Sequence, residues 1–78
     1  MARAHTVWLL MRNVIRDGWH EGDDVEGAWT VKHELQTHIQ KSLRNVEAEI
    51  RDLYHVKAFR DGQINYVNYY TIEEFLSS

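Results

Sequence analysis

The chain has 78 residues, enough for one domain, 1–78, with a small hydrophobic core. It contains no cysteine, which excludes a disulfide framework and a thiolate metal site, and its 44% hydrophobic content excludes a disordered acidic chain. The formal net charge is −3, so the placement of the charges is more informative than their sum.

No segment predicts a membrane span or a secretory leader. The longest apolar run, Val7–Met11, has five residues, whereas a transmembrane helix needs about 20. Residues 1–5 lack the charged, apolar and small-residue regions of a signal peptide. We therefore expect a soluble, cytoplasmic protein with no membrane partner.

Residues 6–17 predict a first helix. Apolar side chains recur there at helical spacing and form one stripe: Val7, Leu10, Met11, Val14 and Ile15. Thr6 can cap this helix and Gly18 can end it. Trp8 and Leu9 lie off the stripe, which gives the helix more apolar surface than a small monomer can bury.

Residues 17–26 predict an exposed acidic loop. They hold no Lys or Arg and have a net charge of −5, carried by Asp17, Glu21, Asp23, Asp24 and Glu26. Three glycines at 18, 22 and 27 favour a loop, in which water screens the repulsion between carboxylates. Solubilisation is the simplest role. A divalent-cation loop is the alternative, but the spacing does not match the alternating ligands and closing Glu of a calcium loop.

Gly27–Trp29 predicts a short extended segment, and Thr30 then caps a helix over 31–36. Thr37 and Gln40 have the spacing of a capping box, which predicts that a second helix starts there after a tight turn.

That second helix, about 38–54, has a narrow apolar seam and a polar outer face. The seam consists of Ile39, Leu43, Val46, Ile50 and Leu53. The first half of the outer face is basic and polar, with Lys41, Arg44 and Asn45, and the small Ser42 lies beside it.

The stretch 56–67 predicts a β-hairpin. Two runs of alternating residues meet at Asp61–Gly62, which favours a type I′ turn because its central residues need positive φ. A two-residue turn implies two cross-strand pairs, Phe59 with Ile64 and Lys57 with Tyr66. It also directs three side chains toward the core: Val56, Ala58 and Val67.

Thr71 and Glu74 have the spacing of a further capping box, which predicts a last short helix that includes Phe75 and Leu76. The surplus apolar surface predicts a homodimer, because a cyclic dimer is the commonest way to bury such a surface. We expect its interface to hold Trp8, Leu9, Phe75 and Leu76.

No constellation predicts an enzyme, a metal site or a cofactor site. His33 and His38 are five residues apart and do not share a helix face, and no Gly-flanked nucleophile or phosphate-binding glycine loop is present. His20 lies among carboxylates, but a zinc site needs three or four convergent ligands. Three tyrosines could stack on the bases of single-stranded nucleic acid, although strand packing explains them better: Tyr66, Tyr69 and Tyr70.

The stretch "AWTVKHELQTHIQKSLRNVEAEIRDLYHVKAFRDGQINYV" resembles a winged helix-turn-helix domain, a DNA-binding module of small prokaryotic and viral regulators. Trp29–Thr30 opens the first helix of the motif, Leu43–Val46 lies inside the second, and Val56–Lys57 leads into the wing. The resemblance implies an α+β fold: a three-helix core with a C-terminal β-hairpin wing and a short final helix.

In that family the second helix of the motif enters the major groove and the wing lies on the DNA backbone. The resemblance therefore implies a sequence-specific regulator of transcription that binds double-stranded DNA, with 38–54 as recognition helix and 56–67 as wing. The implied DNA-binding residues are Lys32, Lys41, Ser42, Arg44, Asn45, Lys57 and Arg60. Arg and Asn suit base edges, whereas Lys and Ser suit phosphate oxygens.

The acidic balance of the chain and the carboxylates Glu47, Glu49 and Asp52 oppose contact with phosphate. The alternative is a winged-helix interaction module or inhibitor that docks on a regulatory or host protein. It would use the acidic loop, 17–26, and the apolar first helix.

Overall fold

The structure, a computed structural model, describes residues 5–60 and 66–78. Within them the chain forms a four-stranded antiparallel sheet and three short helices. In chain order the elements are β1 (Thr6–Arg16), β2 (Trp19–Trp29), α1 (Lys32–Ser42), α2 (Ala48–Arg51), β3 (Tyr54–Arg60), β4 (Val67–Thr71) and α3 (Ile72–Ser77). The strand order is β2-β1-β3-β4, so β1 and β3 are central and β2 and β4 are the edges.

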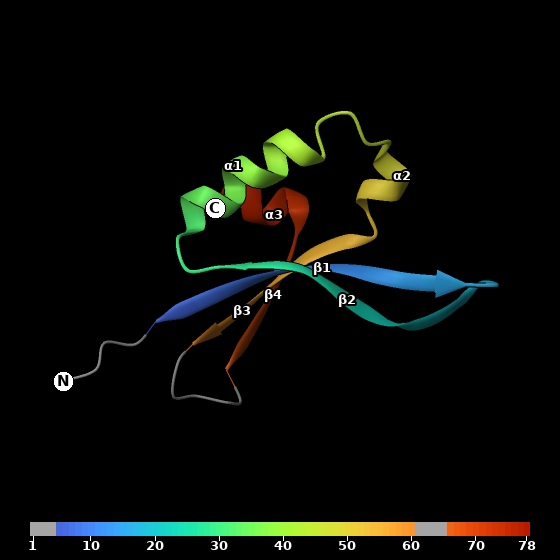
Figure 1. Cartoon of the computed structure of the whole chain (residues 1–78), viewed down its shortest axis with the longest axis horizontal. Helices are drawn as coiled ribbons and strands as arrows, with labels where there is room; N and C mark the ends of the chain where they lie inside the picture. Colours follow the sequence, from blue (N-terminus) through green and yellow to red (C-terminus); the bar gives the residue numbers. More distant parts are fainter. Residues whose placement is uncertain (1–4, 61–65) are drawn as a thin grey trace.

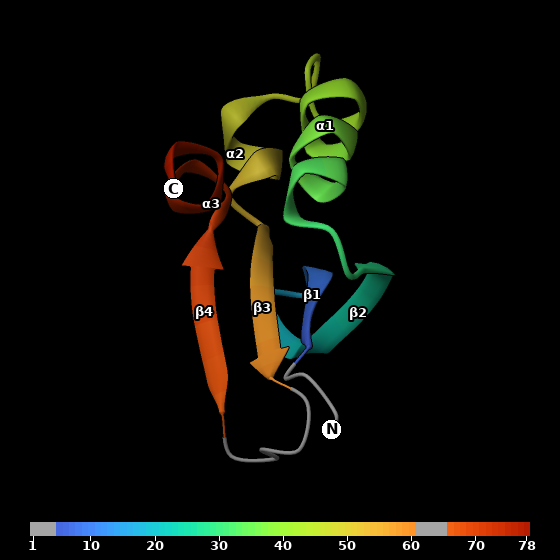
Figure 2. The same cartoon turned by 90° about the vertical axis from the view of Figure 1, so that its left-hand side faces the viewer.

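All three helices lie on one face of the sheet (Figures 1 and 2). The other face, which we call the open face, is covered by no helix or strand of the described part. Because side chains alternate along a strand, the open face takes Leu9 and Met11 of β1, His55 and Lys57 of β3, and Tyr69 of β4.

A small apolar core joins the helices to the sheet. It consists of Leu10, Leu35, Ile39, Leu43, Val56, Ile72 and Phe75. The side-chain amide of Gln36 donates to the carbonyl of Phe75 at 3.1 Å and ties α1 to α3. Gly27 leaves room for the Trp29 ring, since a Cβ at position 27 would lie only 2.5 Å from that ring.

The expectation of a winged helix with a three-helix core is wrong, because residues 6–16 form strand β1 and not a helix. β1 pairs with β2 on one side and β3 on the other. A central strand with apolar contacts on both faces has a near-continuous apolar sequence, without the alternation of a half-exposed strand. In such a run the spacing of Val7, Leu10 and Val14 imitates a helical stripe.

The expectation of an acidic loop over 17–26 is also wrong. Only Asp17 and Gly18 form a turn, and Trp19 begins β2, which includes the four other carboxylates of the stretch. Both turn residues have left-handed backbone conformations, with φ of 53° and 81°. Two central residues with positive φ are the mark of the type I′ hairpin turn, which Asp-Gly favours.

The two helices expected over 31–54 are replaced by α1, a single helix through the expected break at Gln36–Thr37, and by the four-residue α2. The Thr37 hydroxyl donates to the His33 carbonyl at 3.0 Å inside α1, so it does not cap a new helix. Thr30 is not the N-cap either: Val31 holds that position without a side-chain hydrogen bond.

The β3–β4 pair confirms the first strand of the predicted hairpin but not its register. Lys57 pairs with Tyr69, and Phe59 pairs with Val67. The connection is therefore longer than two residues. Asp61–Gly62 and Ile64 lie outside the described residues.

Val56 and Ala58 are buried toward the helices as predicted, whereas Val67 is 45% exposed. The second capping box is confirmed. The Thr71 hydroxyl accepts from the Glu74 amide at 3.2 Å, and the Glu74 carboxylate accepts from the Thr71 amide at 3.1 Å.

Candidate functional site

The β1–β2 hairpin extends beyond the rest of the sheet (Figure 1). Arg12 is the last residue of β1 in register with β3, so residues 13–23, which we call the arm, have a strand neighbour only within the hairpin. The arm closes through Asp17–Gly18, where Arg16 pairs with Trp19.

Large apolar side chains of the hairpin are exposed. Trp19, directly after the turn, is 77% exposed, Ile15 is 52% exposed, and Val25 at the base of the arm is 57% exposed. Ile15 pairs with His20, one step along from the pair of Trp19 with Arg16, so Ile15 and Trp19 belong to opposite faces of the hairpin.

Asp23 fixes the base of the arm to the sheet. Its carboxylate lies 3.1 Å from His20 Nε2, 3.3 Å from Lys57 Nζ and 3.5 Å from His55 Nε2. His20 lies on the same strand, but His55 and Lys57 lie on β3, on the far side of β1. The contact therefore crosses the central strand and restrains the direction of the arm.

The pKa values in this cluster show which charges are present at neutral pH. Burial raises the pKa of Asp23, but hydrogen bonds from His20 and Lys57 and the nearby positive charge outweigh it, so the pKa lies below its ordinary 3.8. Burial lowers the pKa of His55 below its ordinary 6.5, and the attraction of Asp23 only partly offsets that effect. Asp23 is thus ionised and His55 neutral.

His55 is 2% exposed, and neither ring nitrogen makes a hydrogen bond within the described residues. The Tyr69 ring stacks on it with 4.6 Å between ring centroids. His55, Asp23 and Lys57 are close together, yet no serine, cysteine or other nucleophile joins them in the described ranges. No group of three or more His, Asp or Glu side chains there is arranged to hold a metal ion.

The other carboxylates of the stretch face solvent. Glu21 lies 3.5 Å from the exposed Arg16, a surface ion pair of little energetic weight. Asp17, Asp24 and Glu26 form no ion pair with any cation in residues 5–60 and 66–78. The arm therefore presents Trp19 and Ile15 within a negative surface.

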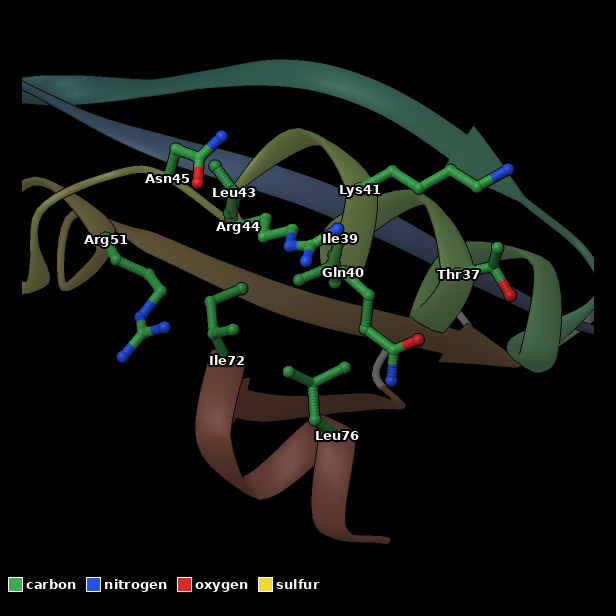
Figure 3. A pocket seen from close by; sticks show the side chains of 10 residues that line it. All are labelled: Thr37, Ile39, Gln40, Lys41, Leu43, Arg44, Asn45, Arg51, Ile72 and Leu76. Atoms are coloured by element: carbon green, nitrogen blue, oxygen red, sulfur yellow. The ribbon is translucent and has the colours of Figure 1, made fainter.

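A second surface lies between α1 and α3. It is an open groove of about 730 Å³ with an apolar lining, Ile39, Leu43, Ile72 and Leu76 (Figure 3). Lys41, Arg44 and Arg51 border it, and Arg51 lies 3.1 Å from Glu73. Lys41 and Arg44 form no ion pair in the described part of the chain. We call this surface the α1–α3 groove.

The residues expected to bind DNA do not share one surface. Lys41, Arg44 and Asn45 line the α1–α3 groove, and Ser42 donates a hydrogen bond to the His38 carbonyl. Lys57 lies on the open face, where Asp23 pairs with it.

The two remaining cations lie over aromatic rings. Lys32 Nζ lies 5.7 Å from the ring centroid of Phe75, and the Arg60 guanidinium lies 4.6 Å from that of Tyr66. These contacts place Lys32 and Arg60 away from the cations that border the α1–α3 groove.

Of the residues expected at a dimer interface, Phe75 is fully buried, and Trp8 and Leu76 pack against the core. Leu9 is half-buried and lies on the open face. Sequence reasoning gave the wrong reason for the apolar excess near Trp8, because β1 buries apolar side chains on both of its faces.

Comparison of the chain with protein-family models, with curated proteins and with solved structures finds no match. Among the described residues, no helix has the length and hydrophobicity to cross a membrane.

Proposed function

We propose that this chain is a protein-interaction module that binds a partner protein through the arm. The 77% exposure of Trp19 at the end of the arm carries the proposal. Tryptophan is among the residues that contribute most to protein interfaces, and it does so when a partner removes its ring from water. The fold itself offers this ring no cover, because β3 ends its pairing with β1 before the arm begins.

The structure also makes the arm a suitable anchor before any partner is present. Ladder pairing and the Asp17–Gly18 turn define its shape, and the contacts of Asp23 with β3 restrain its direction. An element that is already ordered loses less conformational entropy on binding, which leaves more of the interaction energy for affinity.

The charge of the arm indicates the chemistry of the partner. Asp17 in the arm and Asp24 and Glu26 at its base form no ion pair within the described residues, so a complementary surface is an apolar pocket bordered by Lys or Arg. We place this interaction in the cytoplasm as part of the proposal, since the cysteine-free fold needs no oxidising compartment.

Duplex DNA receives less support as a ligand. The cations that would contact phosphate are divided between the α1–α3 groove and the open face, and Asp23 already pairs with Lys57. The negative arm would face any duplex that approached the open face near Lys57.

Affinity capture from the cell that expresses the chain, followed by titration of the purified partner, tests the proposal. Trp19→Ala should weaken the purified complex by about thirtyfold or more, the effect of losing an interface hot spot. Asp24→Lys should weaken the complex more at low salt than at high salt.

Two matched controls lie on α2, away from the arm. Ile50→Ala removes another exposed apolar side chain, and Glu49→Lys makes the same charge change as Asp24→Lys. Both should bind like the wild type. A purified partner that binds Trp19→Ala and wild type equally would overturn the proposal, as would the absence of any protein that binds the wild-type chain.

A further inference from the structure

We infer that the α1–α3 groove receives the arm of a second copy of this chain. The inference rests on the proposed function and names a partner for the same arm. It starts from two surfaces of the described residues, the arm and the groove, which combine apolar side chains with charges of opposite sign.

The groove has room for a large side chain, and its apolar floor is formed by the buried core residues Ile39, Leu43 and Ile72 and the half-buried Leu76. Its volume of about 730 Å³ lies within the usual range for ligand sites of about 300–1,000 Å³. Figure 3 shows Ile72 and Leu76 of α3 directed toward the side chains of α1, with the Arg44 side chain lying along α1 beside Ile39. An indole ring placed there would lie on aliphatic side chains and within reach of a guanidinium, a favourable cation–π arrangement.

The charges of the two surfaces are complementary. Lys41 and Arg44 have no carboxylate partner within the described residues, and Asp17 in the arm and Asp24 at its base have no cationic partner there. Arg51 is already paired with Glu73, so the free cations are on the α1 side of the groove. When Trp19 enters the groove, Asp17, two residues away along the chain, comes near Lys41 and Arg44.

The arm of the same molecule cannot fill its own groove. The arm continues β1 and β2 outward from the sheet, the contacts of Asp23 with β3 restrain its direction, and Figure 1 shows it extending beyond the helices. The occupant must come from another molecule. Reciprocal exchange of two arms closes a two-fold dimer, whereas one-way docking produces longer, open assemblies.

Sedimentation velocity at increasing protein concentration tests this inference. The wild-type chain should self-associate at micromolar concentration, and the association should weaken as salt rises. Trp19→Ala in the arm and Arg44→Glu in the groove should each weaken it by about thirtyfold or more. Both side chains are exposed, so circular dichroism and thermal melting should show an unchanged fold in each variant.

Mixing the two variants gives the decisive result. Trp19→Ala keeps an intact groove and Arg44→Glu keeps an intact arm, so one arm–groove contact can form only between unlike molecules. The mixture should therefore contain a one-to-one complex that neither variant forms alone. Ile50→Ala and Glu49→Lys should associate like the wild type.

A wild-type chain that stays monomeric at high micromolar concentration would overturn this inference, as would an Arg44→Glu variant that associates like the wild type. A mixture that contains only monomers would do the same. If the Trp19-dependent complex with a purified cellular partner still forms in any of these cases, the proposed function stands and only self-docking fails. If that complex is also absent, both fail.

Discussion

The carboxylate of Asp23 on β2 lies 3.5 Å from Nε2 of His55 on β3, although β1 runs between the two strands. The same carboxylate binds Lys57, so one side chain of the acidic hairpin is committed to the sheet and is not available to a partner. This contact explains how a hairpin that extends beyond its sheet keeps a defined direction, on which the proposed interaction depends.

Asp23→Ala should lower the free energy of unfolding by about 1–3 kcal/mol, because it leaves Lys57 without its carboxylate acceptor and removes the negative charge beside the buried His55 ring. Chemical denaturation measures this change. Asp24→Ala is the matched control, since Asp24 is exposed and makes no ion pair in the described residues; its effect should stay within about 0.5 kcal/mol. Equal effects at both positions would show that the Asp23 contacts do not stabilise the fold.

Stability should fall as the pH is lowered through the range of histidine titration. The pKa of His55 is below 6.5 in the folded chain, so in this range the unfolded chain binds more protons and the free energy of unfolding decreases with falling pH. The loss begins near pH 6.5 and continues down to the folded pKa. Asp23 acts in a separate window, because its depressed pKa keeps its contribution until the pH falls below about 3.8.

His55→Phe should reduce the pH dependence between about pH 7 and pH 5, since it removes the titrating ring but keeps a ring to stack on Tyr69. His33→Gln, a change at an exposed histidine of α1, is the control. Denaturation curves at the two pH values give the comparison. An identical pH dependence in wild type and His55→Phe would contradict the burial of a neutral ring.

The turn of the arm should accept only residues that tolerate left-handed backbone. Gly18 has a φ of 81°, so Gly18→Val should cost about 1–2 kcal/mol and increase amide exchange of the arm. Gly18→Asn should be tolerated, because Asn adopts this conformation readily. Hydrogen exchange followed by mass spectrometry would detect the difference. Equal protection in both variants would argue against the two-residue turn.

Thr71→Ala should destabilise the protein by about 0.5–2 kcal/mol, since it removes the N-cap hydrogen bond of α3, the helix that carries Phe75 into the core. For a domain of this size, each kcal/mol lowers the melting temperature by about 4–8 °C. Thr30→Ala should melt like the wild type, because Thr30 does not cap α1. A drop caused by Thr30→Ala and not by Thr71→Ala would reverse this assignment.

Local signals allowed part of the fold to be predicted. The capping box at Thr71 and Glu74 depends only on residues three apart in sequence, and it is present in the structure. The first strand of the hairpin expected over 56–67 was predicted from alternation, and it is present within β3, which faces the core through Val56 and Ala58 and the open face through polar His55 and Lys57.

The first half of the chain could not be predicted from periodicity, because β1 is apolar on both faces and has no period of two. Asp17–Gly18 was the available signal. It has the same residues as Asp61–Gly62, but a glycine that follows a run with helical spacing also predicts a helix end. Reading it as a turn would have made the flanking runs, including the acidic one, into strands.

The candidate site was predicted only in its chemistry. The acidic stretch and the surplus of apolar side chains were noted, but their combination in one exposed hairpin depends on strand pairing. The α1–α3 groove was out of reach because Ile72 and Leu76 come from a helix about 30 residues after α1 in the sequence, and only the packing of the two helices brings them together.

Fluorine NMR of the chain labelled with 5-fluorotryptophan tests the central claim most directly. It gives one resonance each for Trp8, Trp19 and Trp29, and Trp19→Phe assigns the arm resonance. In the free monomer, only the Trp19 resonance should show a strong shift between H₂O and D₂O. On addition of the purified partner, or on self-association, that resonance should move and lose its solvent shift while Trp8 and Trp29 stay unchanged. A complex in which Trp19 keeps its free position and its exposure to water would contradict the account.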